Sequence, residues 1–175
     1  MNDQEEKVIL VDTSDNFLGL MPKLEAHEKG VLHRAFSIFI FNDKQELLLQ
    51  QRALGKYHSP GLWTNTCCSH PRSQETVLQA ATRRLQEEMG FTTALTQKGS
   101  FIYKADFPNG LIEHEYDHIV TGIYNQAPVI NPHEVHDWKW VSLADLEKNM
   151  QQYPQQYTPW FRIIFEKYQS SLRIT

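Results

Sequence analysis

Hydrophobic residues along this chain occur in short runs that are separated by polar turns. The runs are rich in Val, Ile and Phe and are bounded by Asn, Asp, Gly and Pro, which is typical of β-strands. We expect seven strands, at residues 8–11, 17–20, 34–41, 46–50, 101–107, 111–124 and 134–141. The turns at 42–44 and 108–110 predict two hairpins.

Helical spacing of apolar residues is found in four other segments. The clearest helix is expected at residues 74–89, with Ser73 as its N-cap and Gly90 at its end. Further helices are expected at 22–29, from 143 after the cap Ser142, and from 158. Strands and helices alternate without a repeating βαβ period. We therefore predict one domain over residues 1–175 with an α+β fold, in which helices flank a mixed sheet.

The composition is that of a globular protein, with 41% hydrophobic and 22% charged residues. The net charge of −4 argues against a general nucleic-acid-binding protein. No apolar run approaches the roughly 18 residues that a membrane-spanning helix needs, and the first six residues are too polar for a secretory signal. Two adjacent cysteines cannot form an ordinary disulfide with each other, which predicts a reducing, cytoplasmic compartment.

Both cysteines lie side by side in the segment 64–71, and a histidine follows two residues later. Cys68 and His70 offer a thiol, which can be a nucleophile or an acid or base, beside an imidazole that can bind a metal. A buried, inert Cys68 beside an incidental His70 explains the same segment equally well when it is taken alone.

The other candidates for metal binding are spread along the chain. Glu113 and Glu115 lie on one face of a predicted strand, and a site made of three imidazoles and two carboxylates suits Zn, Mn or Fe and tolerates Mg. The set is His27, His33, His70, Glu113 and Glu115. The remaining histidines, His58, His114, His118, His133 and His136, are assigned to the surface or the core.

Four basic residues in or near predicted loops and helix ends could bind a diphosphate through charge-assisted hydrogen bonds. They are Lys23, Arg52, Lys56 and Arg84. Glu88 falls on the apolar face of the helix at 74–89 and needs a partner there. An ion pair with Arg84 and a role as a metal ligand both remain open for Glu88.

The segment from Glu75 to Phe91 resembles the Nudix box, G-x5-E-x7-R-E-U-x-E-E-x-G-U, where U is a bulky apolar residue. The chain keeps Glu75, Arg83, Leu85, Glu87, Glu88 and Gly90. It has Ser69 in place of the first glycine and Arg84 in place of a glutamate. The loss of that box carboxylate argues against hydrolysis, because the box carboxylates of Nudix hydrolases bind the metals that activate attack on phosphorus.

Over nearly its whole length the chain is similar to the type 1 isopentenyl-diphosphate isomerases, a branch of the Nudix fold. The matching segments, in chain order, are Lys23-x3-His27, 32–36, 52–56, 60–65, 68–71, 83–90, Tyr103, Glu113-x-Glu115 and Pro159-Trp160. The family pattern has Cys-Gly-His where this chain has Cys68-Ser69-His70. The register of that motif assigns the catalytic position to Cys68, not to Cys67.

This resemblance implies an isomerase that interconverts isopentenyl and dimethylallyl diphosphate through a tertiary carbocation-like state. Glu115, with Tyr103 hydrogen-bonded nearby, would protonate the alkene, Cys68 would handle the other proton, and Trp160 would place its indole face against the cation. The five metal candidates would hold one tightly bound divalent ion, Mn, Zn or Mg, and Glu88 would bind a Mg²⁺ that arrives with the diphosphate.

We expect a monomer that acts on a small prenyl diphosphate and associates with neither nucleic acid nor membrane. Two rival classes stay open on the sequence alone. One is a Nudix hydrolase of some diphosphate. The other is a non-catalytic zinc-binding or redox-sensing module, which only the paired cysteines and the histidines support.

Overall fold

The structure is a computed structural model that describes residues 6–56 and 58–172. Of the polar N-terminal segment at residues 1–6, only Glu6 is described, and residues 1–5 lie outside the described residues. The strands are β1 (Lys7–Val11), β2 (Phe17–Pro22), β3 (His33–Phe41), β4 (Glu46–Arg52), β5 (Trp63–Thr64), β6 (Cys67–Ser69), β7 (Leu95–Asp106), β8 (Ile112–Ile123) and β9 (Val135–Ser142). The helices are α1 (Lys23–Lys29), α2 (Val77–Met89), α3 (Leu143–Gln152), the 3₁₀-helix η1 (Pro154–Gln156) and α4 (Pro159–Leu172).

Strand β3 is the centre of the sheet, and its sequence explains why. Its nine residues are nearly all buried, as expected for a strand that is covered on both faces. It pairs in parallel with β8, from His33 opposite Glu115 to Phe41 opposite Ile123. Its pairings with β1, β4 and β6 are antiparallel. The predicted mixed sheet and α+β class are therefore confirmed.

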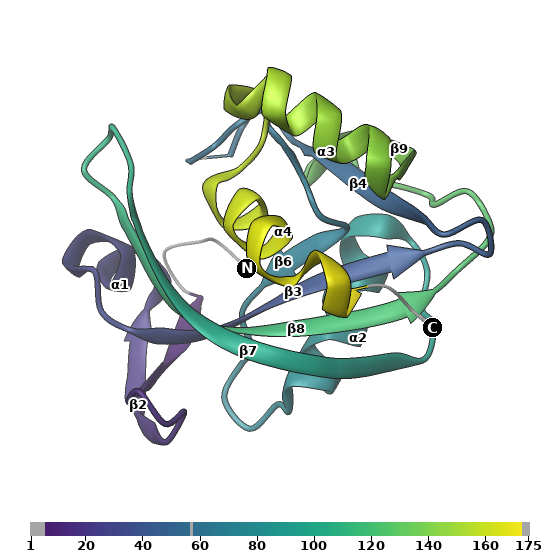
Figure 1. Cartoon of the computed structure of the whole chain (residues 1–175). Coiled ribbons are helices and arrows are strands. Elements are labelled where there is room, and N and C mark those ends of the chain that lie inside the picture. The colour runs from purple at the N-terminus through teal and green to yellow at the C-terminus, as the bar shows by residue number, and fades with distance from the viewer. Residues whose placement is uncertain (1–5, 57, 173–175) are drawn as a thin grey trace.

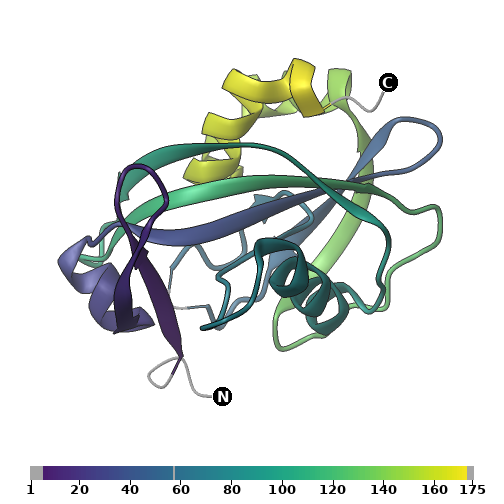
Figure 2. The ribbon, with the colours of Figure 1, turned by 90° about the horizontal axis from the view of Figure 1, so that it is seen from below.

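Strand β3 lies between two helical layers, with α2 on one face of the sheet and α3 and α4 on the other (Figures 1 and 2). Ile38 and Ile40 belong to the core beneath α2, with Leu85 of that helix. Phe39 and Phe41 belong to the opposite core, which α3 and α4 cover. A strand with a side-chain period of two thus builds two hydrophobic cores from one continuous apolar run.

Helix α2 begins three residues later than the sequence predicted. Thr76, not Ser73, is the N-cap, and it forms a capping box with Gln79 in which each side chain bonds the other's backbone N–H. Gln74 has φ +70°, which is incompatible with a helical start at that residue. The predicted end is confirmed, because Gly90 has φ +74° and an added Cβ would lie 2.2 Å from the carbonyl oxygen of Val129.

The other predicted elements are present, with differences where the sequence is polar. Strands β5 and β6 were not predicted, since together they hold only five residues inside a polar segment. Strand β7 starts at Leu95, six residues before the predicted start. The predicted hairpin of β3 and β4 is limited to its turn, because the two strands pair only at Phe41 and Leu47. Along the rest of its length β4 pairs with β9.

The helix caps outside α2 agree with the sequence. Gly30 ends α1 in the left-handed conformation, and the Ser142 side chain accepts from the Asp145 N–H at the start of α3. Within the described residues, no helix has the length and apolar composition that a membrane span requires.

Candidate active site

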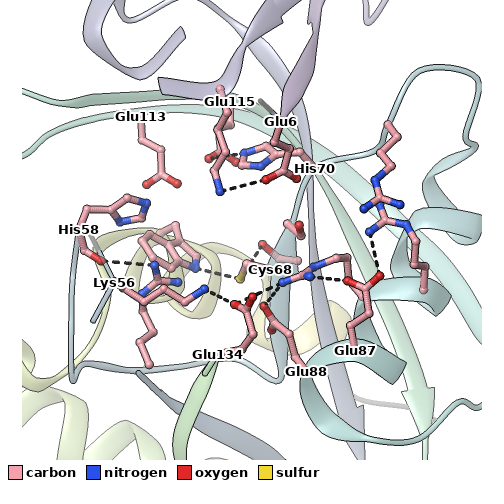
Figure 3. A pocket seen from close by; sticks show the side chains of 18 of the residues that line it. Glu6, Lys56, His58, Cys68, His70, Glu87, Glu88, Glu113, Glu115 and Glu134 are labelled. Carbon is pink, nitrogen blue, oxygen red and sulfur yellow. Dashed lines mark hydrogen bonds and ion pairs between the residues drawn. The ribbon is translucent and has the colours of Figure 1, made fainter. Parts of the chain in front are cut away.

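A cavity of about 370 Å³ opens between α2, the start of β3 and the first turn of α4. It brings together ten of the predicted site residues: Lys23, Arg52, Lys56, Cys68, His70, Arg84, Glu88, Glu113, Glu115 and Trp160. Figure 3 shows Glu113 and Glu115 on one side of the cavity and Glu87, Glu88 and Glu134 on the other, with Cys68 between them. The other three predicted residues, His27, His33 and Tyr103, lie behind this lining and are almost completely buried.

Strand β6 separates the two cysteines, because neighbouring side chains of a strand point to opposite faces. Cys68 lines the cavity and pairs with Ser37 of β3. Cys67 is fully buried in the core beneath α2, where its thiol donates to the Glu88 carboxylate at 3.1 Å. Burial raises the pKa of both thiols above the usual range. The structure therefore places Cys68, as the motif register predicted, and not Cys67, in the cavity.

The Cys68 sulfur has both a donor and an acceptor beside it. The indole N–H of Trp160 donates to Sγ at 3.1 Å, and the thiol donates to Asn65 Oδ1 at 3.0 Å. The Asn65 amide is held in this orientation because its NH₂ donates to the carbonyls of Ile38 and Cys67. Ser69 pairs with Phe36 in the sheet, and its φ angle is not positive. The backbone at this position therefore does not require the family's glycine.

Three imidazoles and one carboxylate meet at the bottom of the cavity. His27, His33, His70 and Glu115 each offer one ligand atom, and these atoms lie within 4.8 Å of one another. The Glu115 Oε1 atom is 3.6 Å from His70 Nε2 and 3.9 Å from His33 Nε2.

Backbone carbonyls fix the tautomers of two of these rings. His27 Nδ1 donates to the Lys23 carbonyl at 2.6 Å, and His33 Nδ1 donates to the Val31 carbonyl at 2.8 Å. When the ring is neutral, Nε2 is then the nitrogen that carries a lone pair and can act as a metal ligand. Burial lowers the pKa of His27 and His70 to about 4, so the rings are neutral at physiological pH. This is the usual arrangement of metal-binding histidines.

The buried Nε2 atoms of His33 and His70 have no hydrogen-bond partner among the described residues. Buried imidazole nitrogens that lack a partner are costly unless an ion or water satisfies them. The donor set of three imidazoles and a carboxylate therefore fits a divalent metal ion such as Zn, Mn or Fe.

The carboxylates of β8 that line the cavity are almost completely buried. Burial, followed by repulsion from Glu115, raises the pKa of Glu113 well above its usual range. Burial, followed among the raising causes by repulsion from Asp117, raises the pKa of Glu115 to about 7. Tyr103 lies opposite Glu115 in the β7–β8 register, and burial and the charges of Glu113 and Glu115 raise its pKa. The family resemblance implied a Tyr103 hydrogen bond near Glu115, but the buried Tyr103 hydroxyl has no hydrogen-bond partner among the described residues.

The structure divides the predicted five-residue metal set. Glu113 does not join the group of His27, His33, His70 and Glu115; it groups with His27 and His58, again with ligand atoms within 4.8 Å. His58, which was assigned to the surface or the core, is buried and lines the cavity. The sequence signal that could have found His58 is its place beside Lys56 in the loop of predicted phosphate-binding residues.

The predicted diphosphate-binding residues converge, and most of them contact carboxylates. Lys23 pairs with Glu6 at 3.4 Å, and Lys56 pairs with Glu134. Glu6 and Glu134 were not recognised from the sequence, because isolated glutamates near strand ends carry no motif.

Arg84 and Glu88 form the ion pair that the sequence left open, at 2.6 Å. The same guanidinium also contacts Glu87 and lies 3.5 Å from Glu134. Both Arg84 and Glu88 line the cavity, so the ion pair places the two residues at its wall and does not remove them from it. Glu88 can therefore pair with Arg84 and still be placed to bind a metal ion in the cavity.

Trp160 is held in place on two sides. The Arg52 guanidinium lies over its ring, 5.3 Å from the centroid, and the His58 ring approaches edge-on at 5.8 Å. Only 3% of Trp160 is exposed. One face of the indole is thus covered by a cation of the protein, and the contact of the indole with a substrate cation stays a prediction.

Comparison with known proteins identifies the family. Residues 31–161 match the NUDIX domain family. An isopentenyl-diphosphate Delta-isomerase of Serratia proteamaculans is 51% identical over 93% of this chain and 90% of its own length. An isopentenyl-diphosphate Delta-isomerase 2 of Photorhabdus laumondii is 53% identical over 91% of this chain and 90% of its own length. The chain belongs to the isopentenyl-diphosphate Delta-isomerases of the Nudix family.

Solved structures agree with the fold of this isomerase family. A Deinococcus radiodurans protein superimposes with a TM-score of 0.66 over 87% of this chain and all of its own, at 18% identity. A MutT protein from Methanosarcina mazei gives the same TM-score over 82% of this chain and 96% of its own, at 19% identity. At such identities the likeness concerns the Nudix fold alone.

Proposed function

We propose that this protein interconverts isopentenyl and dimethylallyl diphosphate, with Glu115 and Cys68 as the two groups that exchange protons with the substrate. The observation that carries the proposal is the meeting of these two residues in one cavity. They come from strands β8 and β6, both of which pair with β3. An alkene held between them can gain a proton on one carbon and lose one from another.

The environment of Glu115 suits the protonating step. Burial holds its pKa near 7, so a substantial fraction carries a proton at neutral pH. That proton passes to the terminal methylene carbon of isopentenyl diphosphate, which becomes a methyl group, and the positive charge develops on the tertiary carbon. Tyr103 lies across the strand pair from Glu115 and closes this side of the cavity against water.

Cys68 takes the proton from the carbon that lies between the cationic centre and the CH₂–O group. The double bond then forms at its new position, and the charge is removed. The indole N–H of Trp160, 3.1 Å from the sulfur, stabilises the thiolate that accepts the proton. Because the reaction is reversible, the two residues exchange roles in the opposite direction.

The diphosphate end of the substrate is assigned to the cations of the cavity. Lys23, Arg52, Lys56 and Arg84 line it, and Lys23, Lys56 and Arg84 contact carboxylates that a diphosphate could replace. Glu88 stands beside Arg84 and would bind a Mg²⁺ ion that accompanies the diphosphate. An arginine at position 84 favours holding phosphate over attacking it, which is consistent with an isomerase.

His27, His33, His70 and Glu115 would hold one divalent ion, with Glu113 at its edge. Such an ion compensates the buried carboxylates electrostatically and orients Glu115. The residues themselves keep water out of this region, since each is at most 8% exposed.

The proposed function is tested by following deuterium from the solvent into the product. Purified protein is incubated in D₂O with isopentenyl diphosphate and Mg²⁺, and the products are read by NMR. Deuterium should enter the methyl group of dimethylallyl diphosphate, because a carboxyl such as Glu115 exchanges its proton with solvent. No inorganic phosphate should be released.

The same measurement tests the hydrolase alternative. Hydrolysis needs a metal-activated water on phosphorus and leaves the carbon skeleton unlabelled. Release of phosphate with an unlabelled skeleton would defeat the isomerase proposal. If neither product forms while the metal site is loaded, the non-catalytic alternative gains instead.

A further inference from the structure

A second group of possible metal ligands adjoins the first. His27, His58 and Glu113 each offer one ligand atom, and these atoms lie within 4.8 Å of one another. The group shares His27 with the set of His27, His33, His70 and Glu115. His58 comes from the loop that follows β4, so it approaches the site from an element that supplies none of the other ligands.

The His58 ring is fixed by its neighbours. It stacks on Phe107 with centroids 5.0 Å apart and an interplanar angle of 23°, and Trp160 contacts it edge-on at 5.8 Å. On its other side the His27 ring lies at 6.1 Å, nearly parallel. A ring that is held between aromatic side chains loses little freedom on binding an ion, which favours ligation.

Glu113 gives an independent indication that a cation belongs here. Its Oε2 atom is buried and has no hydrogen-bond partner among the described residues. A buried carboxylate with an unsatisfied oxygen is costly unless a positive charge lies beside it. The neighbouring His58 ring is itself buried, and a neutral imidazole offers a lone pair to a metal ion.

We propose that His58 is a further ligand of the metal ion that His27 binds. The Nδ1 atom of His27 donates to the Lys23 carbonyl, so this ring has one nitrogen, Nε2, to give to a metal. A ring that gives one nitrogen can bind one ion, so we take the two groups that share His27 as two sides of a single site. The inference rests on the proposed function only in taking His33, His70 and Glu115 as the other side of that site.

The chemical consequence concerns the choice of metal. A site with four imidazoles and two carboxylates favours Zn²⁺, Co²⁺ or Fe²⁺ more strongly than a site with three imidazoles, whereas Mg²⁺ prefers oxygen ligands. His58 would thus bias this chain toward a transition metal.

The test compares wild type with His58→Phe, which keeps the aromatic packing against Phe107 and Trp160 but removes both nitrogens. His58→Ala is a second variant in case the larger ring disturbs the loop. His136→Phe, at an exposed histidine of β9, is the matched control. Zn²⁺ and Mg²⁺ affinities are measured by calorimetry on metal-stripped protein, and the Co²⁺-loaded protein is examined by absorption spectroscopy.

We expect both His58 variants to lose at least about tenfold in Zn²⁺ affinity, the lower end of effects seen for groups that support a metal site. Mg²⁺ affinity should change much less, and the Co²⁺ absorption bands should shift. The His136→Phe protein should match wild type in all three measurements.

An unchanged Co²⁺ spectrum and unchanged Zn²⁺ affinity in the His58 variants would overturn the inference. His33→Ala, measured in parallel, separates this failure from failure of the proposed metal site. If His33→Ala weakens binding and the His58 variants do not, only the role of His58 is wrong. If wild type binds neither Zn²⁺ nor Co²⁺, both proposals fall. None of these measurements contains substrate, so isomerase activity does not affect them.

Discussion

The indole N–H of Trp160 points at the sulfur of Cys68, 3.1 Å away. Trp160 lies in the first turn of α4 and Cys68 in β6, 92 residues earlier. Asn65 accepts from the same sulfur at 3.0 Å, so the thiol has an acceptor and the thiolate has a donor. The site can therefore support Cys68 in both protonation states without moving the backbone.

Trp160→Phe tests the contribution of this contact to turnover. The variant keeps an aromatic ring beside Arg52 and His58 but loses the N–H that donates to the sulfur. We expect kcat to fall about tenfold or more, because a hydrogen bond to a charged group contributes about 1.5–3 kcal/mol. KM should change little. Steady-state kinetics measure both, and Trp63→Phe, a half-buried tryptophan outside the cavity lining, is the control.

Removing each cysteine separately tests which one handles a proton. Cys68→Ala should abolish turnover, whereas Cys67→Ala should leave most of it, because Cys67 faces the core and not the cavity. Cys67→Ala should instead lower the melting temperature slightly, since it removes a thiol that contacts Glu88. Comparable losses of activity in the two variants, or a loss only at Cys67, would mean that the assignment is wrong.

Metal retention is the next expectation. Protein prepared without chelators should contain a tightly bound transition metal. His33→Ala should retain less of it, because His33 Nε2 lies 3.9 Å from Glu115 and has no hydrogen-bond partner among the described residues. Elemental analysis of both proteins decides the point. An active wild type that contains no metal, assayed without added divalent ions, would remove this ligand assignment.

Arg84→Gln should affect both substrate binding and stability. The change removes a cation from the predicted diphosphate site, so we expect KM for isopentenyl diphosphate to rise by about tenfold or more. It also leaves the buried Glu88 without its ion-pair partner, which typically costs about 3–5 kcal/mol of unfolding free energy. Kinetics and thermal melting measure the two effects, and Arg162→Gln, at an exposed arginine of α4, should change neither.

The stability of metal-stripped protein should fall as the pH rises from about 6.5 to about 8. In the folded state the pKa values of Glu115 and Asp117 are raised to about 7 and that of Glu113 further, with burial as the first cause. A carboxyl raised in this way binds more protons folded than unfolded, so its stabilisation is complete below its unfolded pKa and is lost as the pH rises through its folded pKa. This loss ends near pH 7 for Glu115 and Asp117 and continues to higher pH for Glu113.

The buried histidines do not mask this effect. Their folded-state pKa values are lowered from 6.5, so their influence on stability is confined to pH below that value. Melting temperatures between pH 6.5 and 8, with and without Zn²⁺, provide the measurement. The slope should flatten when metal compensates the carboxylates. A stability that rises with pH in stripped protein would contradict the expected direction.

The sequence predicts the central elements of this fold because their physics is local. The apolar run of β3 and the helical spacing of α2 each specify one element, and Gly90 specifies a helix end. The start of α2 was misplaced because Ser73 and Thr76 are both good caps, and only the partner at Gln79 distinguishes them. Strands β5 and β6 were missed because their pairing with β4 and β3 comes from tertiary contacts that no local pattern encodes.

The same distinction applies to the site. Cys68, His70 and Glu115 were found because each belongs to a short motif with a recognisable family pattern. His58, Asn65 and Glu134 were missed because their roles depend on what they face: Phe107 and Trp160 for His58, the Cys68 sulfur for Asn65, and Lys56 and Arg84 for Glu134. Such contacts cross between distant parts of the chain and leave no spacing to detect.

The parallel pairing of β3 with β8 also has a consequence for how the protein folds. Ser37 and Asp117, which bond across this pair, are 80 residues apart in sequence, and His33 faces Glu115 at the same seam. Closing so long a loop is slow, because its entropy must be lost before the contacts form. We therefore expect the metal ligands to come together late in folding. A metal ion that binds these ligands after β3 and β8 have paired should slow unfolding. The metal concentration during refolding should change the yield of native protein more than it changes the rate of early collapse.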